Sequence, residues 1–339
     1  MNICICGGGN LGHVVAGFIA AQGKDRINIL TNKPQLWNSA LETELPSGEK
    51  IYGRLNKVSS YPQDVIPESD IVIICLPGQY IKAEILKIKD YIRKDACVGS
   101  IVCNTGFFFY AHEIIKDQKL FGFQRVPFIS RISEYGRSSQ LLGFKKSLGV
   151  CIENIDNKEY FRSVLERLFK TPIILLESFY EVTFSNSNPL LHPSRIYTMW
   201  KDWTPGISYE NQSMFYEDWT DEASELYVEM DKELQQLLRK LKIPCESIPS
   251  VLEYYESSDA HSLTKKIRSI EAFKSIKSPM IKLYPSNRYV PDLSSRYFTE
   301  DFELGLYFIC KTAKENQMET TTMDIVMEWY ERVKMYNAN

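Results

Sequence analysis

Short apolar runs alternate with longer, helix-periodic segments through the first half of the chain. The run at 70–77, DIVIICLP, is almost entirely apolar, as in a parallel strand that is buried on both faces. Strands that alternate with helices in this way predict a doubly wound α/β domain. The expected strands are 2–6, 27–31, 70–77, 96–104, 121–128, 147–153 and 171–178, and the expected helices are 11–23, 80–93 and 157–169.

After about Glu181 the strand-like runs stop and long periodic segments replace them. Residues 221–242 and 302–316 carry the apolar spacing of amphipathic helices, and clusters of Pro and Ser at 244–250 and 278–294 separate such segments. The sequence therefore predicts two domains, an α/β domain over 1–180 and an all-α domain over 181–339.

The composition narrows the classes of function. The 339 residues carry a formal net charge of −3, so the chain lacks the basic surface typical of proteins that bind nucleic acids or anionic membranes. No apolar run is long enough to span a bilayer, and the N-terminus has neither the basic segment nor the cleavage site of a signal peptide. The eight cysteines form no CxxC pair, which favours a reducing cytoplasm and gives no indication of a metal site.

A glycine-rich hexapeptide, GGGNLG at 7–12, lies between the first expected strand and the first expected helix. It fits the G-x-G-x-x-G pattern, in which Gly7 permits a tight turn, Gly9 lets a pyrophosphate approach the backbone and Gly12 packs helix against strand. Asn10 and Leu11 open the helix, whose N-terminal N–H groups and dipole favour a phosphate. This context predicts a Rossmann-type dinucleotide site.

The end of the second expected strand bears on the choice of cofactor. NAD sites usually place an Asp or Glu there, which accepts hydrogen bonds from the ribose hydroxyls. This chain has Thr31, Asn32 and Lys33 instead, with no acid that would repel a 2′-phosphate. The sequence therefore favours NADP, with NAD as the alternative cofactor.

His192 lies in SNSNPLLHPSRIY (185–197), just inside the expected helical domain. A histidine on a helix is most often a structural residue, but an imidazole also titrates near neutral pH and suits proton transfer. A carboxylate partner would fix its tautomer, and the stretch SRYFTEDFELGL (295–306) offers one. A structural and a catalytic role both stay open on these residues alone.

Five separate stretches make the chain resemble the octopine/nopaline (opine) dehydrogenase family over nearly its full length. They are GGGNLG, LPGQ (76–79), VPFISRISEYG (126–136), NPLLHPSRIY (188–197) and RYFTEDFELGL (296–306). The resemblance implies an N-terminal Rossmann domain and a helical domain like the C-terminal domain of 6-phosphogluconate dehydrogenase. It also implies that an amino acid is condensed with an α-keto acid and that a nicotinamide hydride reduces the imine.

The resemblance assigns the catalytic roles residue by residue. His192 matches the family's catalytic histidine, Asp301 the acid that orients it, and Arg296 an arginine that holds a substrate carboxylate. The implied chemistry suits these side chains. A guanidinium fork binds a carboxylate through two hydrogen bonds, and a His–Asp pair can move the proton that condensation requires.

Further positions follow from the other stretches. Leu76 and Pro77 fall at the end of the third expected strand, on the cofactor side, while Gln79 and Arg131 fall in stretches that line the family's active site. Ser130 departs from the family, which favours Cys there. This departure leaves the details of substrate contact open.

Two other functions also stay open. A 2-hydroxy-acid or ketopantoate-type reductase shares this architecture but relies on a lysine as the acid/base. A non-catalytic NADP(H)-sensing protein would bind the cofactor without turnover, although it would have no need of a proton shuttle. For the opine-type function we expect small-molecule substrates, a homodimer and a cytoplasmic location.

Overall fold

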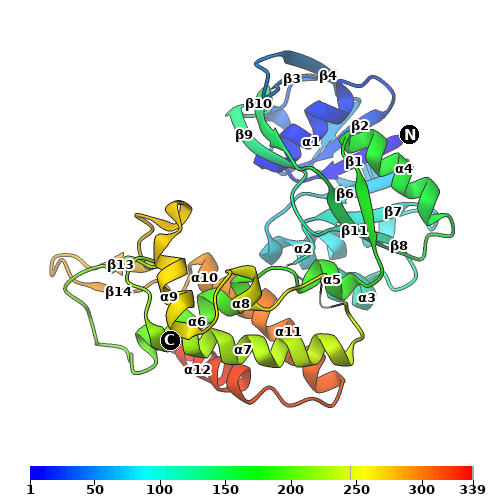
Figure 1. The fold of residues 1–339 in the computed structure, drawn as a ribbon. Helices are drawn as coiled ribbons and strands as arrows, with labels where there is room; N and C mark the ends of the chain where they lie inside the picture. The colour runs from blue at the N-terminus through cyan, green and yellow to red at the C-terminus, as the bar shows by residue number, and fades with distance from the viewer. Residues whose placement is uncertain (105, 245, 338–339) are drawn as a thin grey trace. The chain divides into compact units, whose positions relative to one another are not determined.

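The structure is a computed structural model that describes residues 1–104, 106–244 and 246–337. The chain forms two compact units, Met1–Thr183 and Phe184–Asn339 (Figure 1). The boundary expected at 180 lies within α5 (Phe179–Thr183), the helix that ends the first unit. The assignment of cofactor binding to one unit and of substrate chemistry to the other stays a prediction.

The first unit is built on an eight-stranded sheet with the order β12-β11-β8-β7-β6-β1-β2-β5. Neighbouring strands are parallel except for β11, which runs antiparallel to β8. Apolar side chains are buried along β1 and β6 at the centre of the sheet. Because both faces of these strands are covered, their sequences are continuously apolar and do not alternate with polar residues. The strands are β1 (Asn2–Cys6), β2 (Arg26–Leu30), β5 (Lys57–Ser59), β6 (Ile71–Ile74), β7 (Cys97–Ile101), β8 (Lys119–Phe123), β11 (Leu148–Glu153) and β12 (Ile173–Leu176).

Two apolar cores form in this unit. One includes side chains of α1 (Asn10–Ala20) and α4 (Lys158–Phe169), and the other includes side chains of α2 (Gly78–Ile88) and α3 (Phe107–Ile114). Successive β1 residues alternate between the cores, because Ile3 and Ile5 join the first and Cys4 and Cys6 the second. The predicted doubly wound α/β fold is therefore confirmed.

A second sheet, with the order β4-β3-β10-β9, is absent from the sequence prediction. Its strands are only partly buried, so they show little of the apolar run of a central strand. The single strand expected at 121–128 is wrong, because β8 ends at Phe123 and the chain then enters β9 of the second sheet. The strands are β3 (Ala40–Glu44), β4 (Lys50–Arg54), β9 (Phe128–Glu134) and β10 (Ser138–Phe144).

The second sheet lies against α1 (Figure 1). A Cβ at Gly17 of α1 would lie 2.2 Å from Oγ1 of Thr43 in β3, and one at Gly53 of β4 would lie 2.6 Å from Cβ of Ala20. Glycine at both positions therefore lets the helix and the sheet approach closely. In this way α1 is packed between the two sheets of the unit.

The second unit is helical, and its longest helix, α7, matches the predicted segment 221–242 closely. Thr220 caps α7 by accepting the N–H of Ala223 at 3.2 Å. The expected helix at 302–316 is instead a π-helix followed by an α-helix. The helices are α6 (Asn188–Trp200), α7 (Asp221–Lys240), α8 (Val251–Tyr254), α9 (Ala260–Ser269), α10 (Arg296–Thr299), the π-helix η5 (Asp301–Leu306), α11 (Tyr307–Glu315) and α12 (Thr321–Asn337).

One detail of the all-α prediction is wrong. Strands β13 (Met280–Lys282) and β14 (Tyr289–Pro291) pair antiparallel within the helical unit. Both fall inside the Pro- and Ser-rich cluster at 278–294. Three-residue strands are too short to give an alternating pattern, so sequence periodicity could not reveal them. The short 3-10 turns of the chain are η1 (Pro34–Leu36), η2 (Pro62–Asp64), η3 (Lys89–Tyr91) and η4 (Glu271–Phe273).

Candidate active site

The glycine turn connects β1 to α1, and its glycines have distinct surroundings. Gly7 has a φ of +122°, and a Cβ there would lie 2.5 Å from the carbonyl oxygen of Cys75. A Cβ at Gly12 would lie 2.1 Å from the carbonyl oxygen of Gly7, so the helix and the turn touch only because Gly12 has no side chain. In contrast, among the described residues nothing lies within 4 Å of the Cβ position of Gly9. The backbone at Gly9 is therefore open to a ligand.

The first turn of α1 has no side-chain cap. The N–H of His13 donates to the carbonyl oxygen of Gly9 at 3.0 Å, so the N–H groups of the three preceding residues lie ahead of the first helical hydrogen bond. Such groups, with the helix dipole, suit a phosphate. The Asn10 side chain is bonded to β9, where its Oδ1 accepts the N–H of Ile132 at 2.8 Å. The Leu11 side chain packs against the core. Both residues can serve a cofactor through their backbone N–H groups.

A pocket with about 530 Å³ of empty space lies beside this turn. It brings together five of the expected cofactor residues, from the glycine turn, the end of β2 and the end of β6. Pro77 is not in its lining and precedes α2, with its own side chain exposed. The residues that line the pocket are Gly7, Gly8, Leu30, Thr31, Asn32, Lys33, Leu76, Glu84, Lys87 and Tyr135.

The charged groups of the pocket are only partly those expected. Lys33 was expected, and its Nζ lies 5.9 Å from the ring centroid of Tyr135. Lys87 and Glu84, both on α2, were missed because sequence reasoning looked for charge only at the end of β2. Burial raises the pKa of Glu84 above its ordinary value, which favours the uncharged carboxyl.

His13 ties the glycine turn to two other segments. Its Nε2 accepts the N–H of Gly136 at 2.7 Å, so Nδ1 carries the proton and donates to the carbonyl oxygen of Gly9 at 3.0 Å. The ring stacks on Trp37 at a centroid distance of 4.1 Å and meets the edge of Tyr135 at 4.9 Å. Burial lowers the pKa of His13. Sequence reasoning missed this residue, which holds Tyr135 beside the pocket through contacts distant in sequence.

In the helical unit, His192 contacts Asp301. Nδ1 of the imidazole lies 2.7 Å from Oδ2 of the carboxylate, and the two residues are only 8% and 9% exposed. Because a carboxylate can only accept, Nδ1 carries a proton, and Nε2 of the neutral ring is an acceptor. The contact that the resemblance implies is present, and its catalytic role stays a prediction.

The π-helix η5 presents Asp301 to α6. A Cβ at Gly305 of η5 would lie 2.5 Å from Cγ of Pro189 in α6, so the close approach of the two helices requires a glycine. π-Helical turns occur frequently at functional sites. The periodicity of 302–316 predicted an ordinary helix and could not show this wider turn.

Tyr216 occupies the other side of the imidazole. Its hydroxyl lies 2.8 Å from Nε2 of His192, and its ring is stacked on Phe273 at 4.1 Å. Burial raises the pKa of Tyr216 well above its ordinary value, so the hydroxyl keeps its proton. The aromatic stretch 200–219 could be interpreted from sequence as a pocket wall or as core packing, and nothing in its spacing singles out Tyr216.

Arg296 lies on α10, the short helix that precedes η5. Its Nε and Nη2 donate to Oε2 of Glu300 at 3.0 and 2.7 Å, and this contact raises the pKa of Arg296. The Arg296 side chain is 81% exposed, so it can reach a ligand. The next residue, Tyr297, lies with its ring centroid 4.5 Å from that of His192. Arg296 is therefore on the segment that covers the imidazole.

Gln79 and Arg131 belong to the first unit. Gln79 is exposed in the first turn of α2, and Arg131 is exposed on β9, where its Nη1 donates to the carbonyl oxygen of Ser130 at 3.0 Å. Ser130, the departure from the family, is buried. Neither Gln79 nor Arg131 lines the pocket at the glycine turn, and their assignment to the substrate stays a prediction.

Two features are absent from residues 1–104, 106–244 and 246–337. Among these residues there is no group of three or more His, Cys, Asp or Glu side chains that could hold a metal ion. Within the same ranges no helix has both the length and the apolar character that crossing a bilayer demands.

Comparison with known proteins agrees with the geometry of both units. Residues 175–334 match the family model of the NAD/NADP octopine/nopaline dehydrogenase alpha-helical domain. The opine dehydrogenase of Haliotis discus hannai is 24% identical over 365 residues, covering 98% of this chain and 90% of that protein. A structure of octopine dehydrogenase with NADH and L-arginine has a TM-score of 0.82 at 21% identity, covering 97% of this chain and 88% of that chain. Yersinopine dehydrogenase with NADP+ has a TM-score of 0.70 at 10% identity, covering 100% and 92%.

The surroundings of the glycines predict opposite effects of one small change. Gly12→Ala forces a methyl group against the Gly7 carbonyl and should destabilise the protein by about 1–3 kcal/mol, as overpacking does. Gly9→Ala places a methyl group in open space, so stability should be kept while dinucleotide binding weakens. Urea denaturation and a fluorescence titration with the dinucleotide measure the two effects. If Gly9→Ala bound the dinucleotide as tightly as the wild type, the proposed backbone contact would be wrong.

His13 predicts a dependence of stability on pH. Burial lowers its pKa below the ordinary 6.5, so the unfolded chain takes up a proton that the folded chain excludes. The thermal midpoint should therefore fall as the pH drops below about 6.5, and this dependence should be weaker in His13→Gln. His261→Gln is the matched control, because His261 is an exposed histidine paired with Asp221. An equal pH dependence in wild type and His13→Gln would contradict the assignment.

Proposed function

Since this chain belongs to the octopine/nopaline (opine) dehydrogenase family, we propose that it condenses the amine of an amino acid with an α-keto acid and reduces the imine with a nicotinamide hydride. The observation that carries this proposal is the buried His192–Asp301 pair, which lies inside the segment matched by the family model. Imine formation requires a proton to be moved, whereas cofactor binding alone does not. The opine and octopine dehydrogenases among the relatives support the same chemistry.

We propose that the first unit holds the dinucleotide. The N-terminal N–H groups of α1 would bind the pyrophosphate at Gly9, Asn10 and Leu11, while Gly7 and Gly12 make the turn itself. The adenosine end would lie in the pocket, where the remaining expected residues are Thr31, Asn32, Lys33 and Leu76, with Pro77 beside it. When bound, the cofactor supplies the hydride, and the protein's task is to position the substrate and to manage protons.

The proposed proton chemistry centres on Nε2 of His192. Loss of water from the amine–keto acid adduct requires a proton on the leaving hydroxyl, and a protonated imidazole can provide it. Asp301 accepts a hydrogen bond from Nδ1 and stabilises that cation. The ring therefore keeps its tautomer and its orientation during the reaction. In the direction of opine oxidation the neutral ring would take the proton back.

Arg296 is the proposed anchor of the keto-acid carboxylate. Its contact with Glu300 keeps the guanidinium charged and fixes the plane of the fork. A planar fork binds a carboxylate through two parallel hydrogen bonds, which an ammonium cannot reproduce. Gln79 and Arg131 of the first unit are proposed as further substrate contacts, on the strength of the resemblance.

The proposed substrates are small molecules, an amino acid and an α-keto acid. The octopine dehydrogenase structure with L-arginine supports an amino acid as one of the two. A cytoplasmic location and a homodimer belong to the proposal as well. The location is supported by the cysteines, since Cys4, Cys6, Cys75, Cys97, Cys103 and Cys151 are all free and buried.

The proposed function is tested with a matrix of amino acids crossed with pyruvate, glyoxylate and 2-oxoglutarate, followed by loss of NADPH or NADH. We expect oxidation of the cofactor only when an amine and a keto acid are both present. Oxidation with a keto acid alone would identify a hydroxy-acid or ketopantoate-type reductase. Cofactor binding without oxidation by any pair would identify a sensor.

The catalytic pair predicts non-additive losses. His192→Ala should leave cofactor affinity intact and lower kcat on the order of 10²–10⁴-fold, the usual contribution of a positioned acid/base. Asp301→Asn should also lower kcat, and the double variant should be little worse than His192→Ala, because residues that act as a unit are not additive. Steady-state kinetics measures all three, with His261→Ala as the control that keeps kcat. Losses that multiply would show that the residues do not act together.

The end of β2 predicts the cofactor preference. Wild-type protein should bind NADPH more tightly than NADH, because Asn32 and Lys33 can donate to a 2′-phosphate and the end of β2 carries no acid. Lys33→Glu should narrow or reverse the preference in a side-by-side fluorescence titration. Lys24→Glu makes the same charge change at an exposed position outside the pocket and should leave the preference unchanged. Tighter binding of NADH by the wild type would overturn the assignment.

A further inference from the structure

Both ring nitrogens of His192 are already bonded within the helical unit. Nδ1 faces Asp301 at 2.7 Å, and Nε2 faces the hydroxyl of Tyr216 at 2.8 Å. Tyr216 is only 5% exposed, so this contact lies in the interior of the helical unit. Since Nδ1 is held by Asp301, Nε2 is the atom that must exchange a proton with any substrate. A substrate therefore meets either the imidazole after Tyr216 has moved, or Tyr216 itself.

We propose that Tyr216 is a further catalytic residue of this site, whose hydroxyl carries the proton between Nε2 of His192 and the substrate. The inference rests on the proposed condensation. As water leaves the adduct, the O–H bond of Tyr216 breaks and its proton goes to the leaving hydroxyl, while the Nε2 proton of the cationic imidazole goes to the Tyr216 oxygen. His192 ends neutral, Tyr216 is unchanged, and the positive charge passes to the iminium.

The loop that carries Tyr216 is held by a buried arginine on the same helix as His192. Nε of Arg195 donates to the carbonyl oxygen of Phe215 at 3.2 Å, and its Nη2 donates to that of Asp218 at 2.6 Å. Arg195 is 5% exposed, and burial lowers its pKa to about 10. The two bonds bracket Tyr216 on either side along the chain. α6 therefore fixes both the imidazole and the residue that contacts it.

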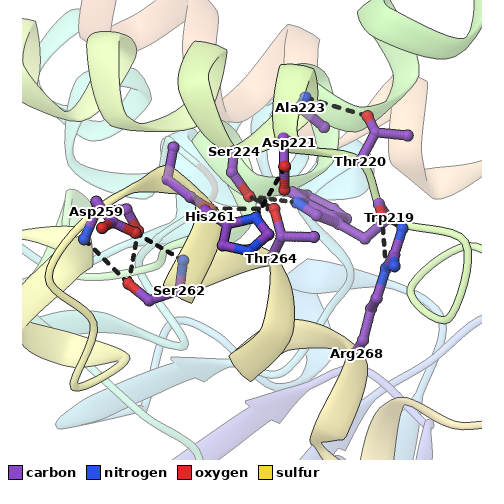
Figure 2. Close-up of polar contacts among 11 residues, drawn as sticks. Trp219, Thr220, Asp221, Ala223, Ser224, Asp259, His261, Ser262, Thr264 and Arg268 are labelled. Atoms are coloured by element: carbon purple, nitrogen blue, oxygen red, sulfur yellow. Dashed lines mark hydrogen bonds and ion pairs between the residues drawn. The ribbon is translucent and has the colours of Figure 1, made fainter.

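A second polar network holds the end of this loop. Nε of Arg268 donates to the carbonyl oxygen of Trp219 at 2.7 Å, and Nε1 of Trp219 donates to Oγ of Ser224 at 2.9 Å (Figure 2). Oγ of Ser224 lies 2.7 Å from Oγ1 of Thr264, which joins α7 to α9 (Figure 2). The Trp219 ring lies nearly parallel to that of Tyr216, at 6.2 Å and 10°. The orientation of Tyr216 is thus set by two helices besides α6.

The hydroxyl of Tyr216 also has a second polar neighbour. It interacts with the hydroxyl of Tyr297, which is half-buried, whereas Tyr216 is buried. Tyr297 directly precedes Phe298 on α10 and directly follows Arg296, the proposed carboxylate anchor. A substrate held by Arg296 would approach Tyr216 from this side. The hydroxyl of Tyr216 thus contacts Nε2 of His192 and also interacts with the hydroxyl of Tyr297.

The chemical state of Tyr216 suits a relay and not a lone base. Burial and the neighbouring tyrosines and Asp301 raise its pKa, so a free phenolate does not persist. Its proton can leave only as another arrives from His192. The relay therefore requires two protons to move together, and this distinguishes it from a tyrosine that only packs against the ring.

Tyr216→Phe tests the relay because it keeps the ring and removes only the hydroxyl. With the amine–keto acid pair found for the wild type, kcat should fall about 10²-fold, within the range of a lost acid/base step, while cofactor affinity stays the same. In mixtures of H2O and D2O the wild-type rate should depend on deuterium content along a curve, as for two moving protons. Tyr330→Phe is the matched control, since Tyr330 is a buried tyrosine of the same unit whose hydroxyl donates to Glu303 at 2.7 Å. It should leave rate and curvature unchanged.

A second measurement keeps this inference separate from the proposed function. The chain has four histidines, so the 15N resonance of Nε2 in His192 can be assigned by its loss in His192→Asn. Tyr216→Phe should move that resonance towards the value of an acceptor without a partner, and Tyr330→Phe should not. An unmoved resonance, a linear isotope dependence in the wild type, or full kcat in Tyr216→Phe would each overturn the relay. Absence of amine-dependent turnover in the wild type would overturn the proposed function and, with it, the catalytic step assigned to Tyr216.

Discussion

The burial of the Asp301 carboxylate is the constraint on which the site in the helical unit depends. An ionised carboxylate that is nine-tenths buried must be paired, because its transfer from water is costly. His192 supplies the partner through Nδ1, and the two meet only because Gly305 lets η5 come against Pro189 of α6. Removal of one member of such a buried pair costs about 3–5 kcal/mol in other proteins, so the contact holds the local fold as well as the tautomer.

The candidate cofactor site in the first unit depends on the backbone of the glycine turn instead. Its turn is tight because Gly7 and Gly12 lack side chains, and the helix N-terminus that results has no side-chain cap. His13 then connects the turn to Gly136, so the wall of the pocket and the glycine turn are fixed by one neutral ring. A dinucleotide needs donors at fixed positions, which a backbone provides. Proton transfer needs titratable groups, which only side chains provide.

This difference explains how much could be predicted from the sequence. The glycine turn is local, since its residues are consecutive and follow an apolar strand, and the structure reproduces its context. The central strands were found for the same reason. The second sheet was missed because strands such as β3 and β4 are only half-buried, and β10 pairs with β3 across nearly a hundred residues of chain. Periodicity carries no information on such distant pairing.

The candidate site in the helical unit was predicted only in part. The residues that were missed are those whose positions depend on contacts distant along the chain. The resemblance carried His192 and Asp301, and the structure brings them together. Neither periodicity nor motif could place Tyr216, because its position depends on two carbonyl contacts with Arg195 and on the network around Trp219. Arg195 itself gave no signal, since a buried arginine in a helix looks in sequence like any charged residue on its surface.

The pocket at the glycine turn contains charged groups besides those at the end of β2. Lys33 and Lys87 line the pocket together with a single carboxyl, that of Glu84. Because burial raises the pKa of this carboxyl, its negative charge is disfavoured in the pocket that the two lysine side chains line. An additional phosphate on the dinucleotide would pair with the lysines and would further disfavour ionisation of Glu84. The charges of the whole pocket therefore support the proposed preference for NADPH, in addition to the residues at the end of β2.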